Sequence, residues 1–145
     1  MTDTIAALTG DHLDVLVRLE TVDEHLDALR AAIEELSAFV GADLERHFAL
    51  EEEALFPVLA RHRDLEEGPL RVMREEHVAC RELVERLAAA VRQDRVAAQI
   101  ETTQAIIDLL RAHIAKEDTV LFAVARATLN ADELREVERR GGSRR

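Results

Sequence analysis

The 145-residue sequence has no tryptophan, no tyrosine and a single cysteine, with only two prolines and five glycines. One cysteine, Cys80, excludes an intramolecular disulfide framework and is typical of proteins from a reducing compartment. The lack of tyrosine excludes a tyrosyl radical and a tyrosine metal ligand. Because helix-breaking residues are rare while Ala, Leu, Glu and Arg are abundant, the composition predicts an all-α fold.

Long apolar runs and positive charge are also scarce. No apolar stretch approaches the roughly 20 residues of a membrane span, and the N-terminus lacks the pattern of a signal peptide. The net charge is −11, which would repel phosphate backbones. We therefore expect a cytoplasmic protein of one domain that binds neither membrane nor nucleic acid, and the sequence does not identify a protein partner.

Apolar residues recur at three- and four-residue steps through four segments, which is the helical period. The predicted helices cover residues 4–20, 21–61 and 70–93, and a fourth follows Asp94 as its N-cap. Thr21 with Glu24 predicts a capping box that starts the second helix, and Pro57 is expected to kink it. Residues 64–69 read as a loop.

Short connections between long helices imply antiparallel neighbours. The fold prediction is an up-down-up-down antiparallel four-helix bundle over residues 1–130. Residues 131–145 are expected to form a short fifth helix, capped by Asn130 and Glu133, and a basic C-terminal tail.

Histidine and glutamate residues interrupt the apolar stripes of these helices. His12 lies on the stripe of the first predicted helix and His77 on that of the third. His47 and Glu51 continue the stripe of the second helix, and His113 and Glu117 continue that of the fourth. Residues four apart share a helix face, so each pair presents an imidazole and a carboxylate to the core.

Buried carboxylates need compensation. Without a cation, burial and like charge are expected to raise the pKa of both Glu51 and Glu117. A bound metal ion would remove this cost. His25 and His62 fall outside the pattern and are expected at the surface, whereas Cys80 is expected to be a small buried apolar residue.

The two His-Glu pairs belong to an internal repeat. The segment 47–58 matches 113–124 at seven positions, counting the acidic pair Glu52 and Asp118, and His12 and His77 are 65 residues apart. Each half of the chain therefore supplies one lone histidine and one His-x3-Glu pair. Two such halves related by a pseudo-two-fold axis would form a two-metal site.

These motifs, with Leu-Phe-Pro after the first pair and Glu-His at 76–77, resemble the hemerythrin-like HHE cation-binding domains over about residues 8–126. The resemblance implies two non-haem iron ions joined by an oxo or hydroxo bridge. The ligands that it implies are His12 and His47 on one iron, His77 and His113 on the other, and Glu51 and Glu117 bridging both. Imidazole and carboxylate ligands alone also admit manganese or zinc.

The sequence departs from the oxygen-carrying hemerythrins at two places. Met73 stands where those proteins have a further histidine, and a thioether is a poor ligand for a hard ion. They also use a His-x4-Asp pair, which Asp118 would complete. However, Asp118 lies about 140° around the helix from His113 and Glu117 only about 40°, so Glu117 is the predicted bridge.

Three functions remain open from these residues. The first is a protein that binds or senses dioxygen, nitric oxide, or iron or redox state. The second is a small diiron oxidoreductase that acts on peroxide or nitric oxide, and the third is a bundle without metal. Glu52, Glu53 and Glu76 are expected beside the ligands or in solvent.

Overall fold

The structure, a computed structural model, describes residues 4–142. This range is helical apart from short turns and contains no strand, so the all-α prediction is confirmed. In chain order the helices are α1 (Thr4–Phe39), α2 (Glu45–Leu50), α3 (Phe56–Leu59), α4 (Arg63–Leu65), α5 (Arg71–Arg92), α6 (Val96–Lys116), α7 (Phe122–Thr128) and α8 (Ala131–Gly142). Wider π-type turns are inserted at η1 (Val40–Leu44), η2 (Glu51–Leu55), η3 (Glu66–Leu70) and η4 (Glu117–Leu121).

The chain divides into two compact units, residues 1–35 and 36–145, and α1 crosses the boundary. The predicted helix boundary between Glu20 and Thr21 is wrong, because α1 continues through it. The hydroxyl of Thr21 donates a hydrogen bond to the carbonyl of Val17 at 3.0 Å, as threonine does inside a helix rather than at a cap. No glycine or proline occurs between Asp11 and Val40, so nothing local ends the helix.

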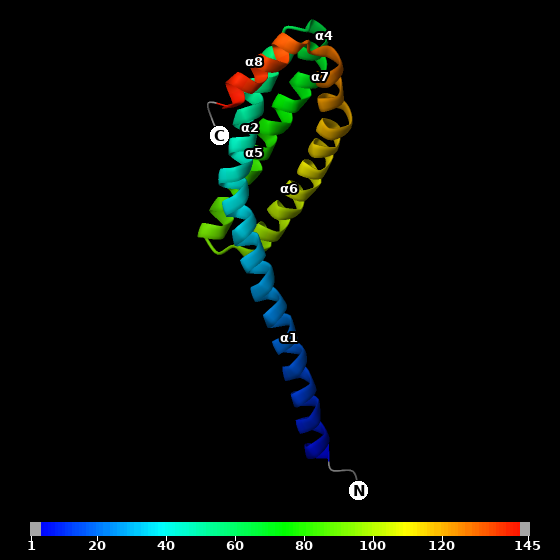
Figure 1. The fold of residues 1–145 in the computed structure, drawn as a ribbon. Helices are drawn as coiled ribbons and strands as arrows, with labels where there is room; N and C mark the ends of the chain where they lie inside the picture. The colour runs from blue at the N-terminus through cyan, green and yellow to red at the C-terminus, as the bar shows by residue number, and fades with distance from the viewer. Residues whose placement is uncertain (1–3, 143–145) are drawn as a thin grey trace. The chain divides into compact units, whose positions relative to one another are not determined.

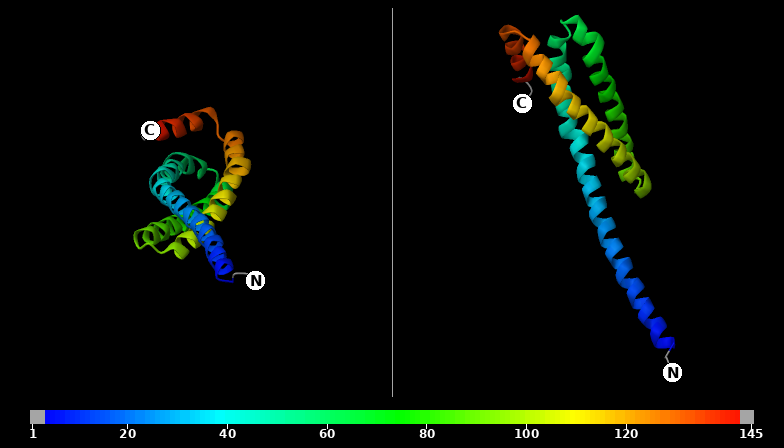
Figure 2. Two further views of the ribbon diagram at one scale, coloured as in Figure 1. Left: turned by 90° about the horizontal axis from the view of Figure 1, so that it is seen from below. Right: turned by 90° about the vertical axis from the view of Figure 1, so that its right-hand side faces the viewer.

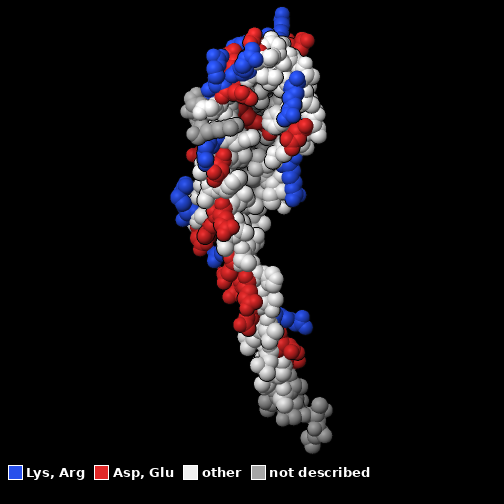
Figure 3. Space-filling model, in the orientation of Figure 1, with Lys and Arg blue, Asp and Glu red and all other residues white. Residues whose placement is uncertain are grey.

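The first unit exposes most of its apolar side chains. Leu8, Val15 and Leu19, which the periodicity predicts to face a core, are 52%, 53% and 59% exposed. Charge is also concentrated in α1, where eight acidic and two basic residues give −6. Acidic side chains accordingly follow this helix in Figure 3, whereas basic and acidic ones mix over α4 and α8.

In the second unit, α5 and α6 lie side by side and antiparallel (Figure 1 and Figure 2). A tight turn joins them at Asp94, whose φ of 49° is in the left-handed region that aspartate tolerates better than most residues. Asp94 is therefore part of the turn and not the N-cap of α6, which Arg95 precedes directly.

The predicted loop at residues 64–69 is helical instead, formed by α4 and η3. Pro69 lies inside η3, where the wide turn accommodates a residue that has no N–H to donate. Pro57 follows the wide turn η2, in the region where the sequence predicts a kink. After the equivalent turn η4, however, the position that corresponds to Pro57 is occupied by Ala123. Proline is therefore not the cause that both wide turns share.

The short C-terminal helix α8 is confirmed. The side-chain oxygen of Asn130 accepts hydrogen bonds from the amides of Asp132 and Glu133, and Glu133 accepts from the amide of Asn130. This reciprocal cap is the one predicted. The helix packs on η2 and α3, and Gly141 lies so close to Leu50 that a Cβ would stand 3.2 Å from its Cδ1.

Further polar contacts join the α3–α4 turn to α8. Arg61 forms a two-pronged ion pair with Glu136, and His62 contacts Glu133 at 3.1 Å. The expectation that His62 is a surface residue is therefore only half right, since its side chain is 34% exposed. Of the predicted basic tail, Arg144 and Arg145 lie outside the described residues.

The core of the second unit lies where α3, η3, α5 and the η4–α7 segment meet. It consists of buried apolar residues Phe56, Val58, Leu59, Leu70, Met73, Leu121, Ala125 and Leu129. No helix in the described range is long and apolar enough to span a bilayer.

Candidate metal centre

Four buried side chains converge in the second unit. Glu51 and Glu117 open the turns η2 and η4, while His77 and His113 come from α5 and α6. One ligand atom from each residue lies within 4.8 Å of all the others, an arrangement that can hold a metal ion. All four residues are at most 5% exposed.

The atoms that face one another in this cluster lack hydrogen bonds. His113 Nε2 lies 2.8 Å from Glu117 Oε1, and His77 Nε2 lies 3.2 Å from Glu51 Oε2, without hydrogen-bond geometry. Both carboxylate oxygens of Glu51 are buried without a partner as well. Because buried polar atoms are costly when unsatisfied, these residues fit a cation that would bind all of them at once.

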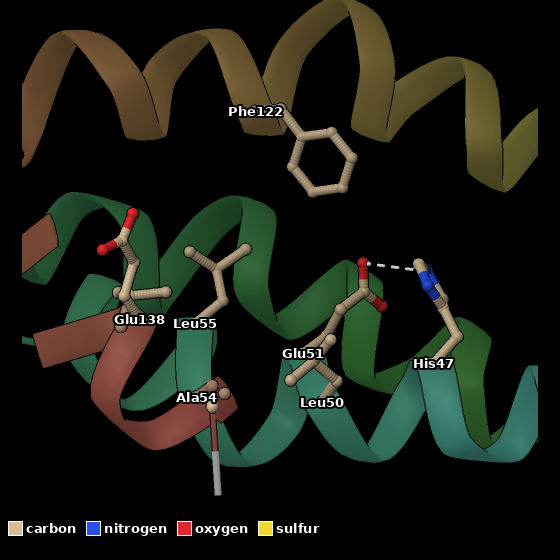
Figure 4. Close-up of a pocket in the computed structure, with 10 residues that line it drawn as sticks. His47, Leu50, Glu51, Ala54, Leu55, Phe122 and Glu138 are labelled. Carbon is tan, nitrogen blue, oxygen red and sulfur yellow. Dashed lines mark ion pairs between the residues drawn. The ribbon is translucent and has the colours of Figure 1, made fainter. Parts of the chain in front are cut away.

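Five of the six predicted ligands come together. The fifth, His47, has its Nε2 3.3 Å from Glu51 Oε1 (Figure 4) and a side chain that is 48% exposed. His12 belongs to the first unit, and its side chain is exposed. His25, predicted at the surface, is also exposed.

The internal repeat is visible in the backbone. Each glutamate of the cluster is the first residue of a π-type turn, and η2 and η4 occupy equivalent positions of the repeat. Such turns inside α-helices are frequent at functional sites. The choice of Glu117 over Asp118 also agrees with the structure, since Glu117 is buried and Asp118 is exposed.

A second layer of charge lies behind the two buried imidazoles. His77 Nδ1 is 2.8 Å from Glu52 Oε1, and Arg81 contacts both oxygens of Glu52. Burial alone would raise the pKa of Glu52, but the hydrogen bonds from Arg81 and His77 outweigh it and lower that pKa.

His113 has an equivalent arrangement. Its Nδ1 lies 2.8 Å from Glu76 Oε2, and Lys116 pairs with the other oxygen of Glu76. Burial again opposes ionisation, yet Lys116 and His113 lower the pKa of Glu76. Arg81 and Lys116 were not among the predicted site residues, although each follows a predicted histidine by three or four positions on the same helix.

The metal-free cluster partly compensates its own charges. Burial raises the pKa of Glu51, but contacts with His47, His77 and Glu117 hold it at about 2. The predicted rise is therefore wrong for Glu51, because the imidazoles next to it stabilise its charge. The contact with Glu51 raises the pKa of His47 against desolvation. Desolvation also lowers the pKa of His113, but the contacts with Glu117 and Glu76 outweigh it, so the pKa of His113 is raised overall.

Comparison with known proteins decides the family. The hemerythrin HHE cation-binding domain matches residues 3–125 of the chain. The chain belongs to this family. No curated protein and no solved structure matches it. The hemerythrin-like resemblance and the helical bundle are thus confirmed, and with the buried His/Glu cluster they identify a metal-binding domain.

Aromatic rings enclose one imidazole of this hemerythrin domain. The ring of Phe48 stacks on His77 at a centroid distance of 3.9 Å, and that of Phe56 is 5.6 Å away on a nearly parallel plane. Phe48 also meets His113 edge-on at 5.8 Å. Both phenylalanines are at most 2% exposed, so they exclude water from this side of the cluster.

An open pocket of about 530 Å³ borders the cluster at His47 and Glu51 (Figure 4). His47 and Glu51 lie at one end of the pocket, and the ring of Phe122 projects towards these two residues from the opposite wall. The remaining lining residues are Leu50, Ala54, Leu55, Val137, Glu138, Gly141 and Gly142. The residues of α8 that line the pocket lie beyond residues 3–125, the segment that matches the hemerythrin domain.

Two further residues of the hemerythrin domain are buried, Met73 and, as predicted, Cys80. Met73 is 3% exposed and packs in the core one turn before His77. Cys80 is fully buried, and burial raises the pKa of its thiol to about 11. The thiol is therefore protonated at neutral pH and acts as an apolar side chain.

Proposed function

We propose that this hemerythrin-family chain is a non-haem diiron protein that binds or senses a small molecule, namely dioxygen or nitric oxide, or responds to iron or redox state. The observation that carries the proposal is the set of buried imidazole and carboxylate atoms without a hydrogen bond in Glu51, His77, His113 and Glu117. Imidazole nitrogen and carboxylate oxygen suit iron, and two carboxylates offset much of its charge.

The ligand set divides into two halves. His77 and His113, with Glu51 and Glu117, would hold one ion. His47, which lies beside Glu51, and His12, which the family resemblance implies, would hold the second ion and share the two carboxylates. Bound iron would supply a change of oxidation state and coordination positions for a small ligand.

The chain's own residues favour a small apolar ligand. Phe48 and Phe56 keep water away from His77, and the pocket that ends at His47 and Glu51 has largely apolar walls. An uncharged diatomic molecule could enter such a pocket without losing hydrogen bonds to solvent.

Metal analysis tests this proposal. Protein purified from its native host should contain about two iron ions per chain, and its optical spectrum should change on reduction. Replacing the shared carboxylate in Glu117→Ala should remove both ions, whereas His12→Ala should remove one. His25→Ala, another exposed histidine of α1, is the matched control and should keep both.

Wild-type protein without bound metal would refute the proposal. Loss of a single ion from Glu117→Ala would refute the bridging role, and full occupancy in His12→Ala would refute the assignment of His12.

Met73 favours a second candidate, a small diiron oxidoreductase that acts on peroxide or nitric oxide. The buried thioether stands one turn before His77, where oxygen carriers of the family place a further imidazole. A protein with fewer strong ligands leaves more exchangeable positions, which favours turnover over storage. Steady-state consumption of peroxide or nitric oxide by the iron-loaded protein separates the candidates, since a binding protein shows none.

A further inference from the structure

Each buried histidine of the metal centre is held from behind by a carboxylate of a neighbouring helix segment. Glu52 of η2 contacts Nδ1 of His77 on α5, and Glu76 of α5 contacts Nδ1 of His113 on α6, both at 2.8 Å. In both residues the opposite nitrogen, Nε2, faces the cluster and has no hydrogen-bond partner. The two histidines thus have the same orientation and the same kind of support.

We propose that Glu52 and Glu76 are positioning residues that fix His77 and His113 as Nδ1–H tautomers, with the lone pair of each Nε2 directed at the metal. This inference rests on the proposed metal-binding function. An imidazole nitrogen can bind a metal only through its lone pair, so the proton must be on the other nitrogen. A carboxylate that accepts from Nδ1–H selects this tautomer and makes the ligand nitrogen more basic.

Cations keep both carboxylates in place. The guanidinium of Arg81 contacts the two oxygens of Glu52 at 2.8 and 3.0 Å. The same guanidinium forms a second two-pronged contact with Glu45, both bonds at 2.8 Å, so its orientation is fixed by two helix segments. Arg81 has donors only, and beside it Glu52 stays an ionised carboxylate that can only accept hydrogen bonds. The hydrogen in the contact between His77 and Glu52 therefore comes from His77.

Glu76 is held more simply. Lys116, one turn after His113 on α6, pairs with the oxygen of Glu76 that does not contact the imidazole. Lysine is a single point charge on a flexible stem and fixes its partner less firmly than a two-pronged arginine. The contact of Glu52 with His77 is therefore the more rigid of the two.

The internal repeat supports a role in the site. Glu52 directly follows Glu51, and its counterpart 66 positions later, Asp118, directly follows Glu117. Glu76 directly precedes His77, and its counterpart 65 positions earlier, Asp11, directly precedes His12. Both halves of the chain thus carry an acidic residue next to the same two kinds of proposed ligand.

Nitrogen-15 NMR of the histidine rings, recorded on the metal-free full chain at about pH 9, where an imidazole is largely neutral, tests the tautomer directly. His77 and His113 should both carry the proton on Nδ1. In Glu52→Gln the tautomer preference of His77 should weaken while that of His113 stays, and Glu76→Gln should show the reverse. Glu75→Gln removes the same charge from an exposed neighbour on α5 and should change neither.

Anaerobic binding of Fe²⁺, measured against a chromophoric chelator, gives the second readout. Each of the two variants should bind Fe²⁺ roughly 10- to 100-fold more weakly than wild type, and Glu75→Gln should bind equally well. Circular dichroism and melting of the metal-free variants separate this effect from misfolding. Glu52→Asp and Glu76→Asp, which keep the charge, should recover part of the affinity.

The outcomes separate this inference from the proposed function. A proton on Nε2 of either histidine in the wild type overturns the inference, whatever the metal does. Fe²⁺ affinities of Glu52→Gln and Glu76→Gln equal to that of Glu75→Gln overturn it while leaving the proposed function intact. A wild-type chain that binds no Fe²⁺ overturns both.

Discussion

Replacing Phe48 tests how closely the stability of the bundle is tied to its metal centre. The ring is 2% exposed, stacks on His77 at 3.9 Å, meets His113 edge-on and lies under Arg81 at 5.5 Å. Truncation of a buried phenylalanine to alanine costs about 3–5 kcal/mol, and a lost aromatic pair adds about 1 kcal/mol. We expect Phe48→Ala to lose stability of this size, a large part of the whole for one domain.

The assay is urea unfolding of the metal-free protein, followed by circular dichroism. For a chain of this length each kcal/mol lowers the melting temperature by about 3 °C, so thermal melting should fall by about 10 °C or more. Phe39→Ala is the matched control, because Phe39 is 56% exposed and its truncation should cost well under 1 kcal/mol. If Phe48→Ala does not fold, Phe48→Leu keeps most of the volume and should cost about 1–2 kcal/mol.

Phe48→Ala should also weaken Fe²⁺ binding, because the ring of His77 loses the surface on which it stacks. Stabilisation of the protein by added Fe²⁺ should then be smaller in Phe48→Ala than in Phe39→Ala at equal metal concentration. Equal losses of stability in the two variants would refute the packing described for Phe48. Equal stabilisation by Fe²⁺ would refute its role in holding the imidazole.

Three further predictions concern the same centre. The metal-free protein should be most stable between about pH 4.5 and 6.5. The pKa of Glu51 is lowered by folding, so the stability that this carboxylate contributes is lost as pH falls from 4.5 towards 2. The pKa of His113 is raised by folding, so the stability that this imidazole contributes is lost as pH rises above 6.5. Thermal melts from pH 3 to 9 that show no such maximum would contradict the ion pairs. The thiol of Cys80 should react with a thiol reagent only upon unfolding, since it is buried and its pKa is about 11, so rapid reaction of the native protein would contradict its burial. Met73→His should slow the air oxidation of the iron-loaded, reduced protein, as stopped-flow optical spectra can measure, and an unchanged rate would show that residue 73 does not control the site.

The helical class and most of the cluster follow from the sequence, because both depend on local periodicity. Positions four apart must share a helix face, so the spacing alone pairs His47 with Glu51 and His113 with Glu117. The repeat likewise predicts that the two glutamates are equivalent, and both do open π-type turns.

Features that depend on competition between alternatives are predicted less well. Thr21 has the spacing of a capping box, but the same hydroxyl can bond to the carbonyl one turn back, and in α1 it does. The pKa of Glu51 cannot be inferred from burial alone, because the direction of its shift depends on how many imidazoles approach the carboxylate. The contacts of Arg81 with Glu45 and Glu52 join residues 36 and 29 positions apart, beyond the reach of a helical pattern.

The π-type turns also reconcile two demands on the same helix. In an unbroken α-helix, the residue five positions after Glu51 would stand about 140° around the axis from it. A turn closed by i to i+5 hydrogen bonds brings that residue, Phe56, back towards the same side, so the carboxylate and the core phenylalanine are both buried. If η2 became ordinary helix without losing a residue, Phe56 and everything after it would rotate by about 100° relative to Glu51. The chain would then have to expose either its metal ligand or its core. The wide turn thus absorbs one extra residue, and a chain that lacked one residue of 52–55 could bury both side chains on an ordinary helix, with Phe56 only about 40° from Glu51.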